Sequence, residues 1–312
     1  MRHDTPVSRP ATMPQPVSAA RDHPEQTDTP TPVVENPWAF LRHYTTARIG
    51  LGRAGTSLPT RHHLAFQQAH AQARDAVHTP LDVPELRAQL IALGVTPVHL
   101  HSAAPDRATY LQRPDLGRRL APASAEAFAG VLAAAATTNS KPPAGSDATP
   151  GFDVVFIVAD GLSALAVQRH AAALLRYALA ECPAEWRIAP VAVVEQGRVA
   201  ISDDIGSLAR ARLAVILIGE RPGLSSPDSL GVYMTYAPAP GNTDANRNCL
   251  SNIREAGLSY EDAARKLGHL MRNAWSRRMS GVHLKDETTT VDALTSGGAP
   301  SRGANFLLHE PD

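Results

Sequence analysis

The sequence has few cysteines, no excess of either charge and no long apolar run. Only Cys182 and Cys249 occur among its 312 residues, so a disulfide framework is poorly supported and a reducing cytosol is the expected environment. Thirty basic residues balance thirty acidic ones, which excludes a strong global field toward nucleic acid or an anionic membrane. No apolar run approaches the roughly 20 residues that cross a bilayer. We therefore expect a cytoplasmic, globular chain with neither nucleic acid nor a membrane as its partner.

Proline is abundant in the first 35 residues, which contain seven prolines among Thr, Ser, Ala and charged residues. Because proline lacks a backbone N–H donor and blocks helix growth, a disordered tail is predicted over residues 1–35. A second turn-rich stretch over residues 138–151 predicts a linker between two domains. The polar, glycine-containing residues 284–312 predict a flexible C-terminal tail.

Between the first tail and the linker, apolar residues recur mainly at helical spacing. This pattern predicts a small, mainly helical N-terminal domain over residues 36–137. Its expected helices cover residues 38–47, 60–77, 83–93 and 124–136, with a short strand over 96–100.

Beyond the linker, apolar strands alternate with helices over residues 152–283. The expected strands cover residues 153–159, 188–194, 213–218 and 232–236, and the expected helices cover 162–180, 204–209 and a last helix capped by Ser259. Such alternation is typical of a mostly parallel sheet with right-handed crossovers. The fold class is therefore predicted to be α/β, with a C-terminal doubly wound, flavodoxin- or Rossmann-like domain.

The loop that follows the strand over 213–218 is the strongest candidate for a binding rim. Ligands of open α/β sheets bind at the carboxyl ends of the strands, where Glu220 is expected. A carboxylate held there can accept hydrogen bonds from a ligand, although Glu220 could also form an ordinary surface ion pair with Arg221. The amide-rich residues 242–249 add donors that a bare turn does not need, so a large, amide-bearing ligand is expected.

Other short patterns have a structural alternative. Residues 160–163, Asp-Gly-Leu-Ser, either contact a ligand or form a capped turn. Residues 50–55 match G-x-G-x-x-G, but no strand precedes them and no helix directly follows, so a glycine connection is favoured over a nucleotide site. The histidine pairs at 62–63 and 99–101 lack a third ligand at metal-site spacing, so no protein-ligated metal is predicted.

Several long motifs in one fixed order resemble those of a known family. Residues 217–229 read Leu-Ile-Gly-Glu-Arg-Pro-Gly-Leu-Ser-Ser-Pro-Asp-Ser, and residues 244–252 read Asp-Ala-Asn-Arg-Asn-Cys-Leu-Ser-Asn. Further matching stretches lie at 47–60, 104–119 and 152–163. Together they resemble the ethanolamine ammonia-lyase small subunit over residues 36–285, and such a set is far more specific than one short pattern.

The resemblance implies a two-chain radical enzyme that converts ethanolamine to acetaldehyde and ammonia with adenosylcobalamin. It implies a large subunit that holds the substrate, a hetero-oligomer, and cofactor contacts at Val199, Glu220 and Cys249. From the residues alone, Val199 could be a simple packing residue, and Cys249 would be assigned to the core. We assign no catalytic acid, base or nucleophile to this chain.

Two further expectations follow from absent motifs. No Asp-x-His-x-x-Gly motif occurs, so we expect the cofactor to keep its own benzimidazole as the lower cobalt ligand. Some members of the family enter bacterial microcompartments through an amphipathic N-terminal helix, but the prolines of residues 1–35 forbid a long apolar stripe. The alternatives are a flavodoxin-like flavin or nucleotide-binding domain of an oxidoreductase, which would use the same sheet edge, and a non-catalytic assembly subunit.

Overall fold

The computed structural model of the chain describes residues 32–138 and 151–285. Most of the predicted tails and of the predicted linker therefore lies outside the described residues. The same holds for most of residues 1–35, whose prolines argue against an amphipathic helix of the kind that leads into microcompartments. The chain divides into two compact units, with the division after Pro59. None of the described helices is long and apolar enough to span a membrane.

The larger unit is built on a six-stranded sheet with the order β3-β5-β4-β6-β7-β8. The strands are β3 (Pro97–His101), β4 (Val154–Ala159), β5 (Val191–Glu195), β6 (Leu213–Gly219), β7 (Leu230–Tyr236) and β8 (Arg247–Ile253). Strands β3, β5, β4 and β6 are parallel, whereas β7 and β8 are antiparallel to their neighbours. The predicted α/β class with a mostly parallel sheet is thus confirmed, and the doubly wound, flavodoxin-like arrangement stays a prediction.

The α-helices described in this unit agree closely with the apolar spacing, and only one of them was missed. They are α1 (Thr60–His78), α2 (Val83–Ala92), α3 (Arg107–Gln112), α4 (Pro122–Thr138), α5 (Ala164–Ala180), α6 (Ile201–Leu208) and α7 (Tyr260–Arg277). Helix α7 begins after the predicted cap, because the Ser259 hydroxyl accepts a hydrogen bond from the Asp262 amide at 3.1 Å. Helix α3 was not predicted because its six residues are too few to show a helical period.

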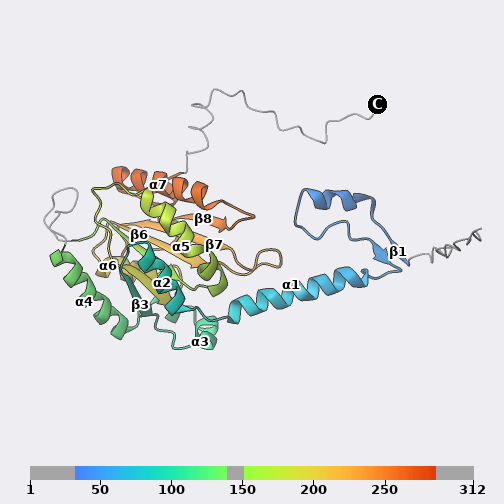
Figure 1. Ribbon diagram of the computed structural model, residues 1–312, viewed down its shortest axis with the longest axis horizontal. Coiled ribbons are helices and arrows are strands. Elements are labelled where there is room, and N and C mark those ends of the chain that lie inside the picture. The colour runs from blue at the N-terminus through green and yellow to red at the C-terminus, as the bar shows by residue number, and fades with distance from the viewer. Residues whose placement is uncertain (1–31, 139–150, 286–312) are drawn as a thin grey trace, which may run out of the picture. The chain divides into compact units, whose positions relative to one another are not determined.

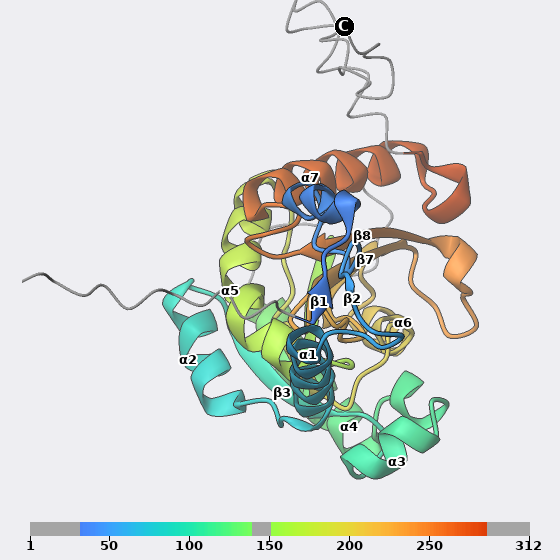
Figure 2. The ribbon, with the colours of Figure 1, turned by 90° about the vertical axis from the view of Figure 1, so that its right-hand side faces the viewer.

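The sheet is covered by helices on both faces, as its fully buried strands β4 and β6 require. In β4, Val154, Phe156 and Val158 join the core that contains α2, α5 and α7. The alternate residues Val155 and Ile157 join the core that contains α4 and α6. Figures 1 and 2 show these two helical layers on opposite sides of the strands.

The separate helical domain expected over residues 36–137 is not confirmed. Strand β3 pairs in parallel with β5 over its whole length, so residues 97–101 form one edge of the same sheet as β4 to β8. The sequence of a single strand among helices does not show which sheet that strand joins. The domain boundary could therefore not be found from composition alone.

The smaller unit contains the strand pair β1 (Val33–Val34) and β2 (Arg53–Ala54) and the 3-10 helix η1 (Pro37–His43). The helix expected over 38–47 is therefore shorter and of the tighter type. Gly50 has φ +59°, and a Cβ there would lie 2.9 Å from the Cα of Ala39. This glycine lets one backbone segment approach another, which agrees with a glycine connection rather than a nucleotide loop.

Candidate functional site

A cavity of about 460 Å³ opens at the carboxyl edge of the parallel strands. Three loops supply most of its lining, namely Gly161 and Leu162 after β4, Arg198 and Val199 after β5, and Glu220 and Arg221 after β6. Parallel strands end at the same edge, so loops far apart in the sequence meet there. The cavity therefore lies where the sequence predicted a binding rim.

Two glycines bring the loops after β4 and β6 into backbone contact. Gly161 has φ +57°, and a Cβ there would lie 2.2 Å from the carbonyl oxygen of Gly219. The Leu162 amide donates a hydrogen bond to that same oxygen at 2.9 Å. The following Ser163 caps α5, accepting a hydrogen bond from the Ala166 amide at 3.3 Å. The Asp-Gly-Leu-Ser stretch thus combines a capped turn with residues that line the cavity.

The side chain of Glu220 is fixed on one side. Its Oε2 accepts hydrogen bonds from the hydroxyl of Ser229 and, at 3.3 Å, from the amide of Asn252. No hydrogen bond joins its Oε1 to any residue that the structure describes, so this oxygen can accept one from a ligand. The alternative reading of Glu220, an ion pair with Arg221, is not formed within the described ranges. The half-buried Val199 lines the same cavity after β5.

Cys249 lies on β8 and does not itself line the cavity. It is exposed and stands opposite Tyr233 of β7, which does line the cavity. Burial raises the pKa of the Tyr233 phenol, and the neighbouring Cys249 thiol raises it further. Although Cys249 is exposed as a residue, partial desolvation of its sulfur raises the pKa of the thiol, so it is protonated at neutral pH. Val199 and Glu220 thus line the same cavity, whereas Cys249 lies next to the cavity-lining Tyr233 without lining the cavity itself.

The sequence reasoning missed a stack of one tyrosine and two arginines beside the cavity. The guanidinium of Arg198 lies 4.4 Å and that of Arg107 lies 4.8 Å from the centre of the Tyr110 ring. Burial raises the pKa of Tyr110 to about 12, and its hydroxyl donates to the Gly197 carbonyl at 3.2 Å. The Nε of Arg198 is buried without a hydrogen-bond partner among the described residues. These residues come together only in the folded chain, because Tyr110 and Arg198 are far apart in the sequence.

Asp160, at the end of β4, is buried beside this stack. Its Oδ1 accepts from the Gly197 amide at 3.1 Å, and its Oδ2 lies 3.5 Å from Nη1 of Arg107. Burial raises the pKa of Asp160 from 3.8 to about 6, although these two partners oppose the shift. The folded protein therefore binds this proton more tightly than the unfolded chain does. The resulting stabilisation is complete below pH 4 and is lost as the pH rises through 6.

Replacing Asp160 with asparagine should therefore change stability in a pH-dependent way. Asparagine has no charge to desolvate. The difference in free energy of unfolding between the variant and the native chain should therefore shift by about 1–3 kcal/mol in favour of the variant when the pH rises from 4 to 7. Urea unfolding at the two pH values measures this gain. Asp115→Asn is the control, because Arg113 lowers the pKa of the exposed Asp115, so this carboxyl stays ionised and its contribution should hardly change between pH 4 and pH 7. A gain that is the same at both pH values would contradict the prediction.

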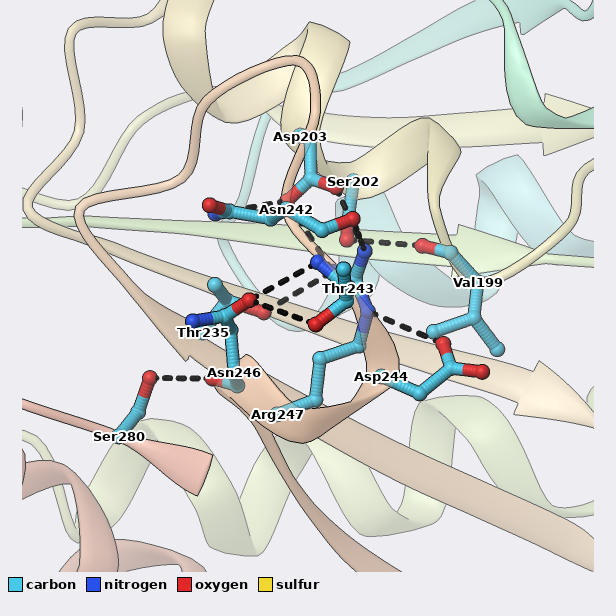
Figure 3. Close-up of polar contacts among 10 residues, drawn as sticks. All are labelled: Val199, Ser202, Asp203, Thr235, Asn242, Thr243, Asp244, Asn246, Arg247 and Ser280. Carbon is cyan, nitrogen blue, oxygen red and sulfur yellow. Dashed lines mark hydrogen bonds and ion pairs between the residues drawn. The ribbon is translucent and has the colours of Figure 1, made fainter. Parts of the chain in front are cut away.

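The amide-rich segment has structural roles that the sequence did not predict. The guanidinium of Arg247 forms a two-pronged ion pair with Asp203 of α6, at 2.6 and 3.0 Å, and both side chains are almost fully buried (Figure 3). Asn246 accepts from the Thr243 amide at 2.9 Å. Asn248 holds the 3-10 helix η4 (Gly281–His283) through the amide and carbonyl of Gly281. The expectation that these donors face a ligand is therefore wrong for Arg247 and Asn248.

A second cavity of about 470 Å³ lies beside α5 and the start of α7. Asp228 Oδ2 is 2.8 Å from Nη1 of Arg169 and 3.5 Å from Nε2 of His170. The other ring nitrogen of His170 lies 2.7 Å from the Tyr260 hydroxyl. Partial burial opposes ionisation, but Arg169 and His170 lower the pKa of Asp228 overall. These contacts fix the far end of the loop that begins at Glu220.

The histidine pairs have ordinary partners. His99 Nε2 lies 2.7 Å from Glu195 Oε1, and His101 Nδ1 lies 2.9 Å from the Ser102 carbonyl oxygen. His63 contacts Gln67 within α1. Across residues 32–138 and 151–285, no group of three or more His, Cys, Asp or Glu side chains could hold a metal ion.

The fold and the cavity define an α/β protein with a pocket at the carboxyl edge of its mostly parallel sheet, the place where such sheets bind their ligands. The family model of the ethanolamine ammonia-lyase light chain (EutC) matches residues 35–285, and the chain belongs to this family. It is 56% identical to the ethanolamine ammonia-lyase small subunit of Azotobacter vinelandii, over 90% of this chain and 98% of the relative. The small subunits of Ralstonia nicotianae and Xanthomonas campestris are 55% and 54% identical, over 91% and 90% of this chain and 98% and 99% of theirs.

Proposed function

We propose that this chain is the small subunit of an adenosylcobalamin-dependent ethanolamine ammonia-lyase. With a large subunit, it would convert ethanolamine to acetaldehyde and ammonia. Two observations support the proposal. The chain belongs to the family, and a cavity lined by Val199 and Glu220 opens at the carboxyl edge of its sheet. The chain would act in the cytoplasm as part of a hetero-oligomer.

The lining is chemically suited to a corrinoid. A corrin ring carries apolar methyl groups and amide side arms, so it needs apolar contacts together with donors and acceptors at the rim. Leu162, Val199 and Ile218 supply apolar surface, while Glu220 supplies an acceptor. Arg198, which also lines the cavity, would supply guanidinium donors for an amide carbonyl.

The size of the cavity indicates a shared site. Its volume of about 460 Å³ is that of a small-molecule pocket, and a corrinoid with its nucleotide tail is far larger. This chain would therefore cover one part of the cofactor, and the large subunit would hold the rest together with ethanolamine. We assign to this chain the binding and orientation of the cofactor and the exclusion of water, and no acid, base or nucleophile.

When bound, adenosylcobalamin supplies radical chemistry through its cobalt–carbon bond. No histidine lines the cavity formed by the described residues, so we propose that no histidine of this chain would replace the cofactor's own benzimidazole. Protein grown with nitrogen-labelled histidine tests this point by paramagnetic resonance. A splitting of the cobalt signal by histidine nitrogen would contradict it.

Reconstitution of the two chains tests the whole proposal. The small and large subunits are purified separately, mixed, and assayed for acetaldehyde from ethanolamine with and without adenosylcobalamin. We expect activity only when both chains and the cofactor are present. Activity of the large subunit alone would exclude a necessary role for this chain. A yellow protein that retains flavin and ignores cobalamin would instead favour the oxidoreductase alternative.

A further inference from the structure

Residues 32–58 form a folded segment that has no apolar core of its own. The β1–β2 pair, the 3-10 helix η1 and the close backbone approach at Gly50 give it a defined shape. Yet none of the residues from 32 to 58 is buried. Ordering a chain costs conformational entropy, and the burial of apolar side chains normally offsets that cost. A segment of this kind is stabilised when another surface covers it.

The apolar side chains needed for such a contact are present and exposed. Twelve large apolar side chains are exposed among the described residues, and six of them belong to this one segment. They are Val34, Trp38, Phe40, Tyr44, Ile49 and Leu58. Tyr44 is 83% exposed and Trp38 is 62% exposed. Exposed aromatic side chains at this density are typical of a protein interface rather than of a free surface.

The charges of the segment indicate what kind of surface covers it. Residues 32–58 contain three arginines, Arg42, Arg48 and Arg53, and one acidic residue, Glu35, so the segment carries a net positive charge. Like charge disfavours pairing with a second copy of the same segment. Nucleic acid would satisfy the arginines but would leave most of the six apolar side chains uncovered. An apolar groove with an acidic rim, on another polypeptide, satisfies both features.

We propose that residues 32–58 dock into an acidic-rimmed apolar groove of the large subunit. This inference rests on the proposed function, because it takes the large subunit as the occupant. Aromatic side chains would fill the groove and supply most of the affinity, while the arginines would set the orientation and speed the encounter. The segment would then be a docking element that is distinct from the cavity at the sheet edge.

The test measures binding of the full-length small subunit to the large subunit. The triple variant Trp38→Ser, Phe40→Ser, Tyr44→Ser should bind at least about 30-fold more weakly, because buried aromatic residues dominate interface energetics. The control is the double variant Ile91→Ser, Val282→Ser, which removes exposed apolar side chains of the other unit and should bind like the native chain. Neither set loses a core contact, so both free variants should melt at the native temperature. Arg42→Glu should slow association and weaken its dependence on salt.

Fluorescence gives a second measurement that does not depend on activity. Trp186 and Trp275 stack on each other inside the larger unit, whereas Trp38 is exposed. Quenching of Trp38 by acrylamide should therefore fall when the large subunit is added, and a Trp38→Phe chain should lose this change. The proposal is overturned if the triple variant binds the large subunit with native affinity. It is also overturned if the triple variant loses self-association or RNA binding instead of binding to the large subunit. If the native chain does not bind the large subunit at all, the proposed function fails with it.

Discussion

Replacement of Arg247 with alanine is expected to lower the free energy of unfolding by about 3–5 kcal/mol, because it leaves the Asp203 carboxylate buried without its partner. The two side chains are 2% and 3% exposed and share two hydrogen bonds of 3.0 and 2.6 Å. Arg247 also donates to the Thr235 hydroxyl at 3.2 Å, so the change also disturbs β7. Chemical denaturation of the isolated chain at neutral pH measures the loss.

An exposed ion pair provides the matched control. Arg113 and Asp115 are 2.7 Å apart, but their side chains are 60% and 58% exposed. Arg113→Ala should therefore cost far less stability than Arg247→Ala, because solvent screens an exposed pair. The double variant Arg247→Met, Asp203→Leu should recover most of the lost stability, because it removes both charges together. If Arg247→Ala lowered the free energy of unfolding no more than the exposed control does, the buried ion pair would not be more important for stability than an exposed one.

Arg247 also shows why part of the site could not be predicted from the sequence. In the chain it stands among amides at the end of a candidate binding loop, which favoured a ligand contact. Its partner Asp203 lies 44 residues earlier, in α6, and no local pattern joins the two. The same polarity concealed β8, whose residues from Arg247 to Ile253 lack the apolar alternation of a strand. Only the pairing of β8 with β7 shows that these side chains serve the fold.

The parallel strands could be predicted because burial on both faces leaves a local signal. Every residue of β4 and β6 is buried, and both strands read as unbroken apolar runs. The carboxyl ends of β4, β5 and β6 fix the position of the cavity, so topology placed Val199 after β5 and Glu220 after β6 at the same edge. Strand β7 follows β6 after a loop without a helix, and such a connection joins antiparallel strands. The order of β3 in the sheet depends on contacts with β5 that leave no trace in composition.

Enlarging Cys249 is expected to weaken cofactor binding far more than it changes stability. Cys249 is exposed and faces Tyr233, so Cys249→Trp adds bulk beside the cavity wall without filling the core. For the reconstituted pair, we expect the dissociation constant of adenosylcobalamin to rise by about 10- to 100-fold, the range that follows from losing 1.4–2.8 kcal/mol. Cys249→Ser keeps the size of the side chain and should bind normally, which separates shape from thiol chemistry.

The same measurement applied to Glu220 tests the acceptor rather than the shape. Glu220→Leu removes the oxygen proposed for the ligand, and it also leaves the Ser229 hydroxyl without its acceptor. Glu220→Gln keeps one carbonyl oxygen, so it should lose less cofactor affinity than Glu220→Leu while melting closer to the native chain. Glu255→Leu is the control, since Glu255 follows β8 but lines the second cavity. Native cofactor affinity in both Cys249→Trp and Glu220→Leu would place the corrinoid away from this edge of the sheet.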